Sequence, residues 1–211
     1  LFPYTTLFRS IIWLIYSKIW LLFLVKKPYN YFSTQSSLSK KEECFIISWM
    51  ETLAPWKLKV TDFYQQYEFS LQHTDLPQEM SFLTDKEYIL ALKSKVENIF
   101  SVHLSNDIDV VAHKLEKGQT IKVHNDMRDV KNRETHRILL QLNKNFKEEN
   151  GGFLLILDEQ DIVEVIHPIS GSIQGFEISR KSNHAVSTVH GGERLTIVYS
   201  FRELSNNHQL T

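Results

Sequence analysis

The stretch SNHAVSTVHGGERLTIVYSFR, residues 182–202, contains two strand-like runs joined by the glycine pair Gly191-Gly192. Gly-Gly between β-rich runs is a turn signal, so the two runs should pair as neighbouring antiparallel strands. Alternation along the second run divides its side chains between two faces. One face carries Arg194, Thr196, Val198 and Ser200, and the other carries Leu195, Ile197, Tyr199 and Phe201. The first set is mixed polar and apolar, whereas the second is wholly apolar and suits a core.

The runs before this stretch are also short and rich in β-forming residues. They are 109–115, 119–124, 136–142, 153–157, 162–166 and 172–178, followed by 184–189 and 194–201 within the quoted stretch. Only the interval 125–135 is long enough for a crossover helix, so we expect a mainly antiparallel sheet. The many short strands favour a sandwich or barrel, and a jelly roll fits best. The predicted fold is mainly β with N-terminal helices.

The helices are expected in the first half of the chain. Ser39 and Glu42 form a capping-box pattern ahead of an apolar periodicity that ends at Pro55. Thr84 and Glu87 form the same pattern at the start of a second amphipathic segment. Both patterns predict an N-capped helix.

We divide the 211 residues into one compact domain with additions at both ends. Residues 1–27 are an artefact or an unassigned lead-in, since LFPYTTLFRS at the start resembles a translated sequencing adapter. Residues 28–108 form a helical support region, in which 58–73 could be strand or loop. The β core spans 109–204, and residues 205–211 are a tail.

Composition narrows the class of partner. The 24 basic and 25 acidic residues leave a formal charge of -1, so we expect neither nucleic acid nor an anionic membrane as a partner. The apolar run 11–25 is shorter than the roughly 20 residues of a spanning helix. The single cysteine, Cys44, suits a reducing cytoplasm and is expected to be a core thiol.

A candidate metal site lies in GQTIKVHNDMRD, residues 118–129. His124 and Asp126 are two residues apart at a strand end, so both side chains point to one face. With His184 as a third ligand they would form a facial triad, which leaves open positions on non-haem iron(II). An H-x-D pattern alone also arises by chance as a surface histidine beside a turn aspartate. The same three ligands could hold zinc in a hydrolase.

Arg194 shares a face with Thr196 inside the predicted barrel, where a guanidinium requires an anion. The distal carboxylate of 2-oxoglutarate would match its planar fork, with the Thr196 hydroxyl as a second donor. The alternative is an ion pair with an internal Asp or Glu.

The order H-x-D, a distant histidine, and an arginine ten residues later resembles the prolyl 4-hydroxylase-like 2-oxoglutarate oxygenases. The resemblance covers 109–202 and includes RILLQLNKNFKEENGGFLLI, residues 137–156. Over 45–202 the chain is also similar to a bacterial subgroup associated with gene clusters for cyclophane-containing ribosomal peptides. METLAPWKLKVTDFYQQYEFSL and AHKLEKGQTIKVHND carry that closer likeness.

The resemblance implies a double-stranded β-helix that binds Fe(II) and uses 2-oxoglutarate and O2. It implies hydroxylation of a C–H bond, with 2-oxoglutarate converted to succinate and CO2. Asp126 departs from the halogenases, which have a small residue there, and Ser200 departs from the DNA-repair relatives, which carry a second arginine there. The implied substrate is a peptide side chain, including one premodified by a partner enzyme. A cupin-like binding module without oxygen chemistry is the competing hypothesis.

Three further residues bear on the site. His113 lies in a strand and could face the cofactor. His136 and Arg137 begin the strand after the metal turn and could reach the mouth of the site, although a strand-edge position is the favoured interpretation. The remaining polar-context histidines are expected to be solvated; they are His73, His103, His190 and His208.

Overall fold

The computed structural model describes residues 24–36, 38–127 and 133–204. The predictions for the adapter-like segment, for most of the apolar run and for the whole 205–211 tail, including His208, therefore lie outside the described residues. Among the described helices, none is long and apolar enough to cross a membrane.

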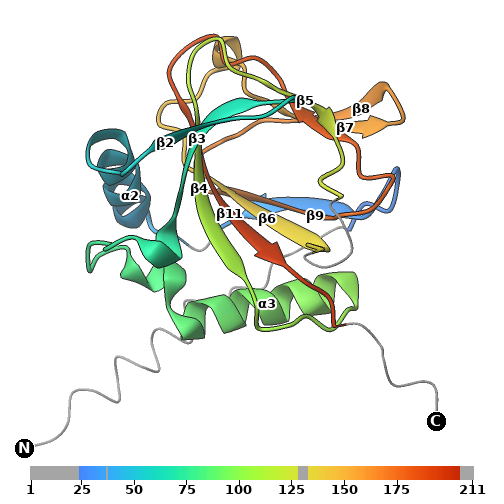
Figure 1. The fold of residues 1–211 in the computed structure, drawn as a ribbon, viewed down its shortest axis with the longest axis horizontal. Helices are drawn as coiled ribbons and strands as arrows, with labels where there is room; N and C mark the ends of the chain where they lie inside the picture. The colour runs from blue at the N-terminus through green and yellow to red at the C-terminus, as the bar shows by residue number, and fades with distance from the viewer. Residues whose placement is uncertain (1–23, 37, 128–132, 205–211) are drawn as a thin grey trace, which may run out of the picture.

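Two antiparallel sheets face each other and form the body of the molecule (Figure 1). The seven-stranded sheet has the order β1-β9-β6-β11-β4-β3-β2, and the four-stranded sheet has the order β5-β10-β7-β8. The strands of the larger sheet are β1 Tyr31–Gln35, β2 Lys57–Val60, β3 Gln65–Ser70, β4 Asp109–Leu115, β6 His136–Gln141, β9 Ser172–Glu177 and β11 Arg194–Phe201. The smaller sheet consists of β5 Ile121–His124, β7 Leu154–Asp158, β8 Asp161–Ile166 and β10 His184–Val186. This is the jelly roll, or double-stranded β-helix, that the sequence predicts.

Each of the predicted β runs contains a strand, and the bounds of β4 and β11 coincide with the predicted 109–115 and 194–201. β5 and β10 are shorter than predicted. The predicted pairing of the two runs joined by Gly191-Gly192 is wrong, because β10 pairs with β5 and β7 in the smaller sheet, whereas β11 pairs with β4 and β6 in the larger one. The segment 58–73 resolves into β2, β3 and the short 3-10 helix Leu71–His73. The N-terminal region thus adds strands to both edges of the larger sheet, since β1 pairs with β9 and β3 pairs with β4.

Two helices cover the outer side of the larger sheet. Helix α2, Lys40–Thr52, starts at the predicted capping box, in which Ser39 and Glu42 bond reciprocally. Helix α3, Lys86–Phe100, runs beneath that sheet (Figure 1). Its N-cap is Asp85, without a side-chain cap bond, so the predicted capping box at Thr84 is wrong by one residue because Thr84 still belongs to the preceding 3-10 turn, Ser81–Thr84.

The core-thiol prediction for Cys44 is wrong, because that side chain is exposed. Its helix neighbour Glu43 is buried instead and accepts a hydrogen bond from Ser170 Oγ at 3.2 Å. The apolar period of α2 is carried by Ile46, Trp49 and Met50, so the cysteine falls just outside the buried stripe.

Strand β11 separates the two cores, and all eight of its residues are buried. Leu195, Ile197 and Tyr199 pack with the helices, as alternation predicts. Val198 packs between the sheets with Leu139, Leu154, Ile156 and Phe176. The face with Arg194 and Thr196 therefore looks into the space between the sheets.

Candidate active site

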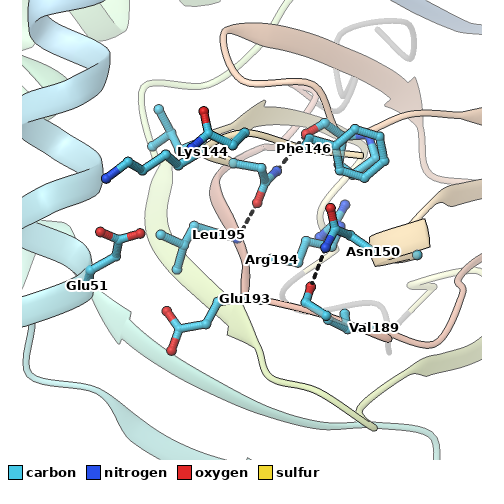
Figure 2. Close-up of a pocket in the computed structure, with 15 residues that line it drawn as sticks. Glu51, Lys144, Phe146, Asn150, Val189, Glu193, Arg194 and Leu195 are labelled. Atoms are coloured by element: carbon cyan, nitrogen blue, oxygen red, sulfur yellow. Dashed lines mark hydrogen bonds between the residues drawn. The ribbon is translucent and has the colours of Figure 1, made fainter. Parts of the chain in front are cut away.

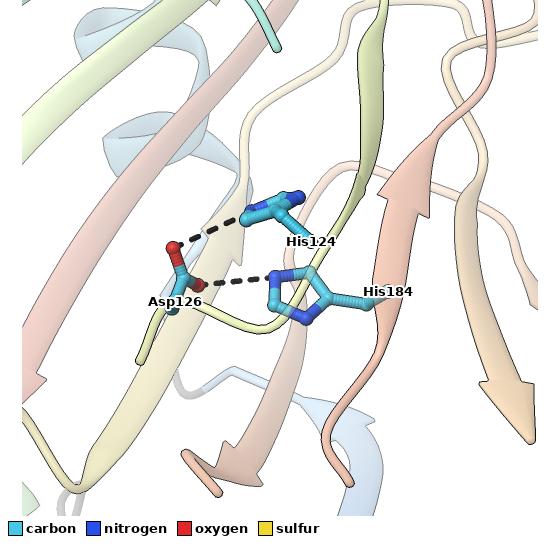
Figure 3. A group of neighbouring side chains, drawn as sticks. All are labelled: His124, Asp126 and His184. Atoms are coloured by element: carbon cyan, nitrogen blue, oxygen red, sulfur yellow. Dashed lines mark ion pairs between the residues drawn. The ribbon is translucent and has the colours of Figure 1, made fainter. Parts of the chain in front are cut away.

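The three predicted metal ligands come together at the edge of the smaller sheet (Figure 3). His124 ends β5 and is the register partner of His184, the first residue of β10. Asp126 follows β5 in the left-handed region, with φ of 59°. One ligand atom from each residue lies within 4.8 Å of the others. The two histidines are far apart in the sequence, but they lie side by side because β5 and β10 are paired strands.

Hydrogen bonds fix the orientation of both imidazole rings. Nδ1 of His124 lies 2.8 Å from Lys122 O, and Nδ1 of His184 lies 2.8 Å from Ser182 O. A ring nitrogen facing a carbonyl donates its proton, so the Nε2 atoms carry the lone pairs. Both Nε2 atoms face the Asp126 carboxylate, at 3.4 and 3.1 Å. Burial lowers the pKa of His184, which favours its neutral form.

Lone pairs on two imidazoles and a carboxylate that converge in this way repel one another unless a cation lies between them. Two imidazole nitrogens and one carboxylate oxygen are a donor set that suits iron(II). The backbone carbonyls on the Nδ1–H groups are the outer contacts that usually hold metal-binding histidines in place. The residues present therefore fit an iron(II) ion.

Arg137 contributes a positive charge beside this cluster. Its guanidinium forms ion pairs with Asp126 through Nη1 and with Glu134 through Nη2. Burial alone would raise the pKa of Asp126, but the Arg137 guanidinium beside it outweighs burial and holds that pKa well below the ordinary value. Asp126 is thus an anion, which is the form that binds metal.

A cavity of about 260 Å³ between the sheets connects the cluster to Arg194 and Thr196. Arg194 is only 6% exposed and has no acidic partner among the described residues. Its Nε donates to Gly152 O at 2.8 Å and its Nη1 donates to Thr196 Oγ1 at 2.9 Å. Its Nη2 is buried with no hydrogen-bond partner. The alternative of an internal Asp or Glu partner is therefore not what the structure shows.

Gly152 allows this contact by the absence of a side chain. The φ angle is 67° at Gly151 and 72° at Gly152, both in the left-handed region that favours glycine. A Cβ on Gly152 would lie 3.0 Å from Arg194 Cδ. The loop backbone can approach the guanidinium only because residue 152 has no Cβ.

The Thr196 hydroxyl is part of a buried polar chain. It accepts from Arg194 and donates to Gln141 Oε1 at 3.0 Å, and Gln141 Nε2 donates to Gln174 Oε1 at 2.8 Å. In this arrangement the hydroxyl proton is already used. The Thr196 hydroxyl thus contacts the guanidinium, and its role as a second donor to the ligand stays a prediction.

Arg194 also lines a second pocket, of about 420 Å³, together with Lys144, Phe146 and Asn150 (Figure 2). Asn143 braces the base of this pocket, because its Oδ1 accepts from Leu195 N at 2.7 Å and its Nδ2 donates to Pro168 O at 2.7 Å. Asn150 donates to Gly191 O at 3.2 Å. These bonds tie the loops on either side of Arg194 to the start of β11.

The residues left open by the sequence now have positions. His113 lines the cavity, and burial lowers its pKa to about 4. Arg137 reaches the metal cluster, so the favoured strand-edge interpretation is wrong for it. His136 points the opposite way, against Phe100, with ring centroids 4.8 Å apart. The sequence feature that could have indicated this position is a charged residue near the start of a mainly apolar strand.

The sequence did not indicate that residues of the β2–β3 hairpin line one side of the cavity. Phe63 stacks on His124 with ring centroids 4.7 Å apart, and Gln66 lines the cavity with its Oε1 buried and unpartnered. No pattern in residues 58–73 indicated that they approach the metal cluster, because the contact depends on the hairpin bridging to β5 through Tyr64 and Ile121.

Residues 110–202 match the family model described as the 2OG-Fe(II) oxygenase superfamily. The chain is a 2-oxoglutarate-dependent dioxygenase. Its cofactors are Fe(II), 2-oxoglutarate and O2, as the sequence resemblance implied. The dioxygenase has no match among curated protein sequences.

Solved structures share the dioxygenase's fold at low sequence identity. A Pseudomonas putida prolyl-4-hydroxylase is 14% identical with a TM-score of 0.69, over 83% of this chain and 93% of that one. A viral collagen prolyl hydroxylase from Paramecium Bursaria Chlorella virus-1, in a 2-oxoglutarate complex, is 16% identical with a TM-score of 0.62, over 82% and 96%. A Trichoplax adhaerens prolyl hydroxylase bound to a hypoxia inducible factor peptide fragment is 15% identical with a TM-score of 0.63, over 81% and 82%.

Proposed function

We propose that this dioxygenase hydroxylates an unactivated C–H bond on a peptide side chain, with His124, Asp126 and His184 as the iron ligands and Arg194 as the anchor of 2-oxoglutarate. The observation that carries the proposal is the pairing, in one cavity, of a metal-ligand cluster with a buried arginine that has no acidic partner among the described residues.

The three ligands have distinct tasks in this proposal. The two Nε2 atoms and one Asp126 oxygen would hold the ion, and the Nδ1–H bonds to Lys122 O and Ser182 O keep the rings from rotating. A bound iron(II) supplies positions for the keto-acid end of 2-oxoglutarate and for O2. Phe63, stacked on His124, limits water access from the mouth.

Arg194 binds the distal carboxylate through its unpartnered Nη2. Gly152 O and Thr196 Oγ1 hold the other guanidinium nitrogens, so the fork is oriented before the ligand arrives. Burial lowers the pKa of Arg194 to about 10, because no anion compensates its charge. A carboxylate at this point would relieve that desolvation penalty.

A peptide substrate is supported by the likeness to prolyl hydroxylases, one of which is seen with a peptide fragment. The chain's resemblance to the cyclophane-cluster subgroup extends the proposal to a ribosomal peptide, including one premodified by a partner enzyme. A cytoplasmic location and a 109–204 catalytic domain supported by 28–108 remain parts of the same proposal.

The test is anaerobic reconstitution with iron(II) and 2-oxoglutarate, followed by oxygen and a succinate assay with candidate peptides. The expected result is oxygen-dependent succinate and a peptide heavier by one oxygen atom. Neither a cupin-like binding module nor a zinc hydrolase would form succinate. The Asp126→Ala protein is the control for iron chemistry in solution. Activity confined to free amino acids or nucleobases would contradict the peptide assignment.

A further inference from the structure

The Asp126 carboxylate needs something to orient it. Asp126 lies beyond the end of β5 with φ of 59°, a region that non-glycine residues seldom adopt. The His124 and His184 Nε2 atoms next to it carry lone pairs and cannot donate. Among the described contacts, the hydrogen-bond donor to this carboxylate is Arg137 Nη1, which bonds Oδ2. Oδ1 is the oxygen that faces His124, at 3.4 Å from its Nε2, whereas Oδ2 faces both Arg137 and His184 Nε2, the latter at 3.1 Å.

Arg137 is itself fixed from several directions. It lies on β6 as the register partner of Ser200 on β11, so its side chain enters the cavity from the inner face of the larger sheet. The side chain is 14% exposed. Glu134, 15% exposed, holds Nη2, and the two carboxylates raise the pKa of Arg137 despite its burial. The guanidinium is therefore permanently charged and bridges two acids.

We propose that Arg137 is a positioning residue for the metal ligand: it holds Asp126 Oδ2, so that Asp126 binds the ion through Oδ1 alone, and Glu134 balances the charge of Arg137. This inference rests on the proposed function in one respect, the assignment of Asp126 as a ligand. A carboxylate with one oxygen engaged by a guanidinium offers the other oxygen to a metal. That leaves one more position of the ion open than bidentate binding by Asp126 would.

Electrostatics and positioning predict opposite signs for the loss of Arg137. Arg137 carries a positive charge close to the ion, so Coulomb repulsion alone predicts tighter metal binding when that charge is removed. If Arg137 positions Asp126, removal instead weakens metal binding, because the carboxylate loses its only described donor. The direction of change therefore separates the two roles.

Arg202, whose partner Asp109 lines the same cavity, provides a matched control. It also bridges two carboxylates, with Nη2 at 2.5 Å from Asp109 Oδ2 and Nε at 3.5 Å from Asp107 Oδ2. Asp109 lines the cavity, but neither aspartate is in the metal cluster. Arg202→Met thus removes an arginine of the same kind without touching a ligand.

The experiment titrates Co(II) anaerobically into the full-length wild type, Arg137→Met, Arg137→Lys, Arg202→Met and Asp126→Ala proteins, with thermal unfolding of each. Loss of an outer contact to a ligand typically lowers metal affinity about 10–100-fold, and we expect that for Arg137→Met, with altered Co(II) absorption bands. Arg137→Lys should recover part of the affinity, because an ammonium restores one donor but not the fork. Arg202→Met should bind Co(II) like the wild type.

Equal or tighter Co(II) binding by a folded Arg137→Met protein would overturn the positioning role while leaving the ligand assignment intact. Should Arg137→Met unfold, Arg137→Lys carries the test: because the charge is kept, a lowered Co(II) affinity with altered absorption bands supports positioning by the guanidinium fork, and wild-type affinity with an unchanged spectrum overturns it. Wild-type protein that binds no Co(II), or Asp126→Ala that binds it as well as wild type, would overturn the proposed metal site itself.

Discussion

Arg194 and Arg137 lie in the same cavity but in opposite electrostatic situations. Arg137 contacts two carboxylates, whereas Arg194 contacts Gly152 O and Thr196 Oγ1, which are neutral. Burial lowers the pKa of Arg194, whereas the two acids raise the pKa of Arg137. The charge of Arg137 is balanced by acids of the protein, whereas Arg194 has no acidic partner among the described residues.

This difference separates a structural charge from a ligand-binding charge. A buried cation without a counterion is destabilising, so its retention indicates that an anion is supplied from outside. A cation between two acids already has its counterions and instead restrains them. The comparison therefore predicts that Arg194 affects co-substrate binding and that Arg137 affects metal binding.

The largest expected effect comes from replacing one of the three proposed metal ligands. His124→Ala, Asp126→Ala or His184→Ala leaves two protein ligands on an open ion, and metal binding and succinate formation should both fall below detection. Anaerobic Co(II) titration and the succinate assay measure these effects. Parental 2-oxoglutarate consumption by the His184→Ala protein would show that the third ligand is another residue.

The next effect is the loss of the unsatisfied arginine. Breaking a buried charge pair costs roughly 3–5 kcal/mol, and about 1.36 kcal/mol corresponds to tenfold. Arg194→Ala should therefore weaken 2-oxoglutarate binding at least about a hundredfold. Titration of 2-oxoglutarate into the iron-loaded, oxygen-free protein, followed by metal-to-ligand absorption, gives the affinity.

The same variant tests the division of roles between the arginines. Co(II) affinity of Arg194→Ala should match the wild type, since Arg194 contacts none of the three cluster residues. If Co(II) affinity fell as much as co-substrate affinity, the two ends of the cavity would not act independently. Unchanged 2-oxoglutarate affinity in a folded Arg194→Ala protein would remove the anchor assignment.

A smaller effect is expected from the loop that touches Arg194. Gly152→Ala places a Cβ 3.0 Å from Arg194 Cδ at a residue with φ of 72°, and such strain costs of order 1–3 kcal/mol. We expect 2-oxoglutarate affinity to fall about tenfold, as the guanidinium is displaced, while Co(II) affinity stays unchanged. Gly192→Ala is the control, because it has φ of 67° but an open environment. Equal effects from both variants would point to general loop strain.

Much of this site could be predicted from the sequence because it depends on local rules. Strand alternation placed Arg194 and Thr196 on one face. It is not what places Asp126 beside His124, because Asp126 lies beyond the end of β5 with φ of 59°. The capping-box pattern at Ser39 gave the start of α2. Recognition of the family pattern then joined His184 to the other two ligands, which no local rule could do.

What could not be predicted depends on register between distant strands. Arg137 meets Asp126 because β6 lies beside β11 with Arg137 opposite Ser200, and a single sequence does not contain that pairing. The same holds for Phe63, which reaches His124 only through the β2–β3 hairpin. Cys44 shows that the apolar periodicity of a helix does not fix which residues at the margin of the stripe are buried. Glu43 is buried, whereas the next residue, Cys44, is exposed.

The smallest predicted effect concerns Thr196 and distinguishes two ways in which a hydroxyl can support Arg194. Thr196→Val keeps the β-branched shape and removes only the oxygen that accepts from Arg194 and donates to Gln141. If the hydroxyl orients Arg194, its loss reaches the co-substrate only indirectly, through the guanidinium, and 2-oxoglutarate affinity should fall less than about tenfold. A direct bond to the charged carboxylate is worth about 1.5–3 kcal/mol and would give a larger loss.

Gln141→Leu provides the second arm of this test. If Thr196 acts through the Gln141 contact, the two single changes affect one hydrogen-bonded unit and their effects on 2-oxoglutarate affinity should not add in the double variant. If Thr196 instead donates directly to the co-substrate, Gln141→Leu frees its proton for the carboxylate, and affinity should rise or stay level. A fall greater than tenfold for Thr196→Val, together with unimpaired binding by Gln141→Leu, would therefore restore the hydroxyl as a direct donor and leave Gly152 O as the principal support for the Arg194 guanidinium.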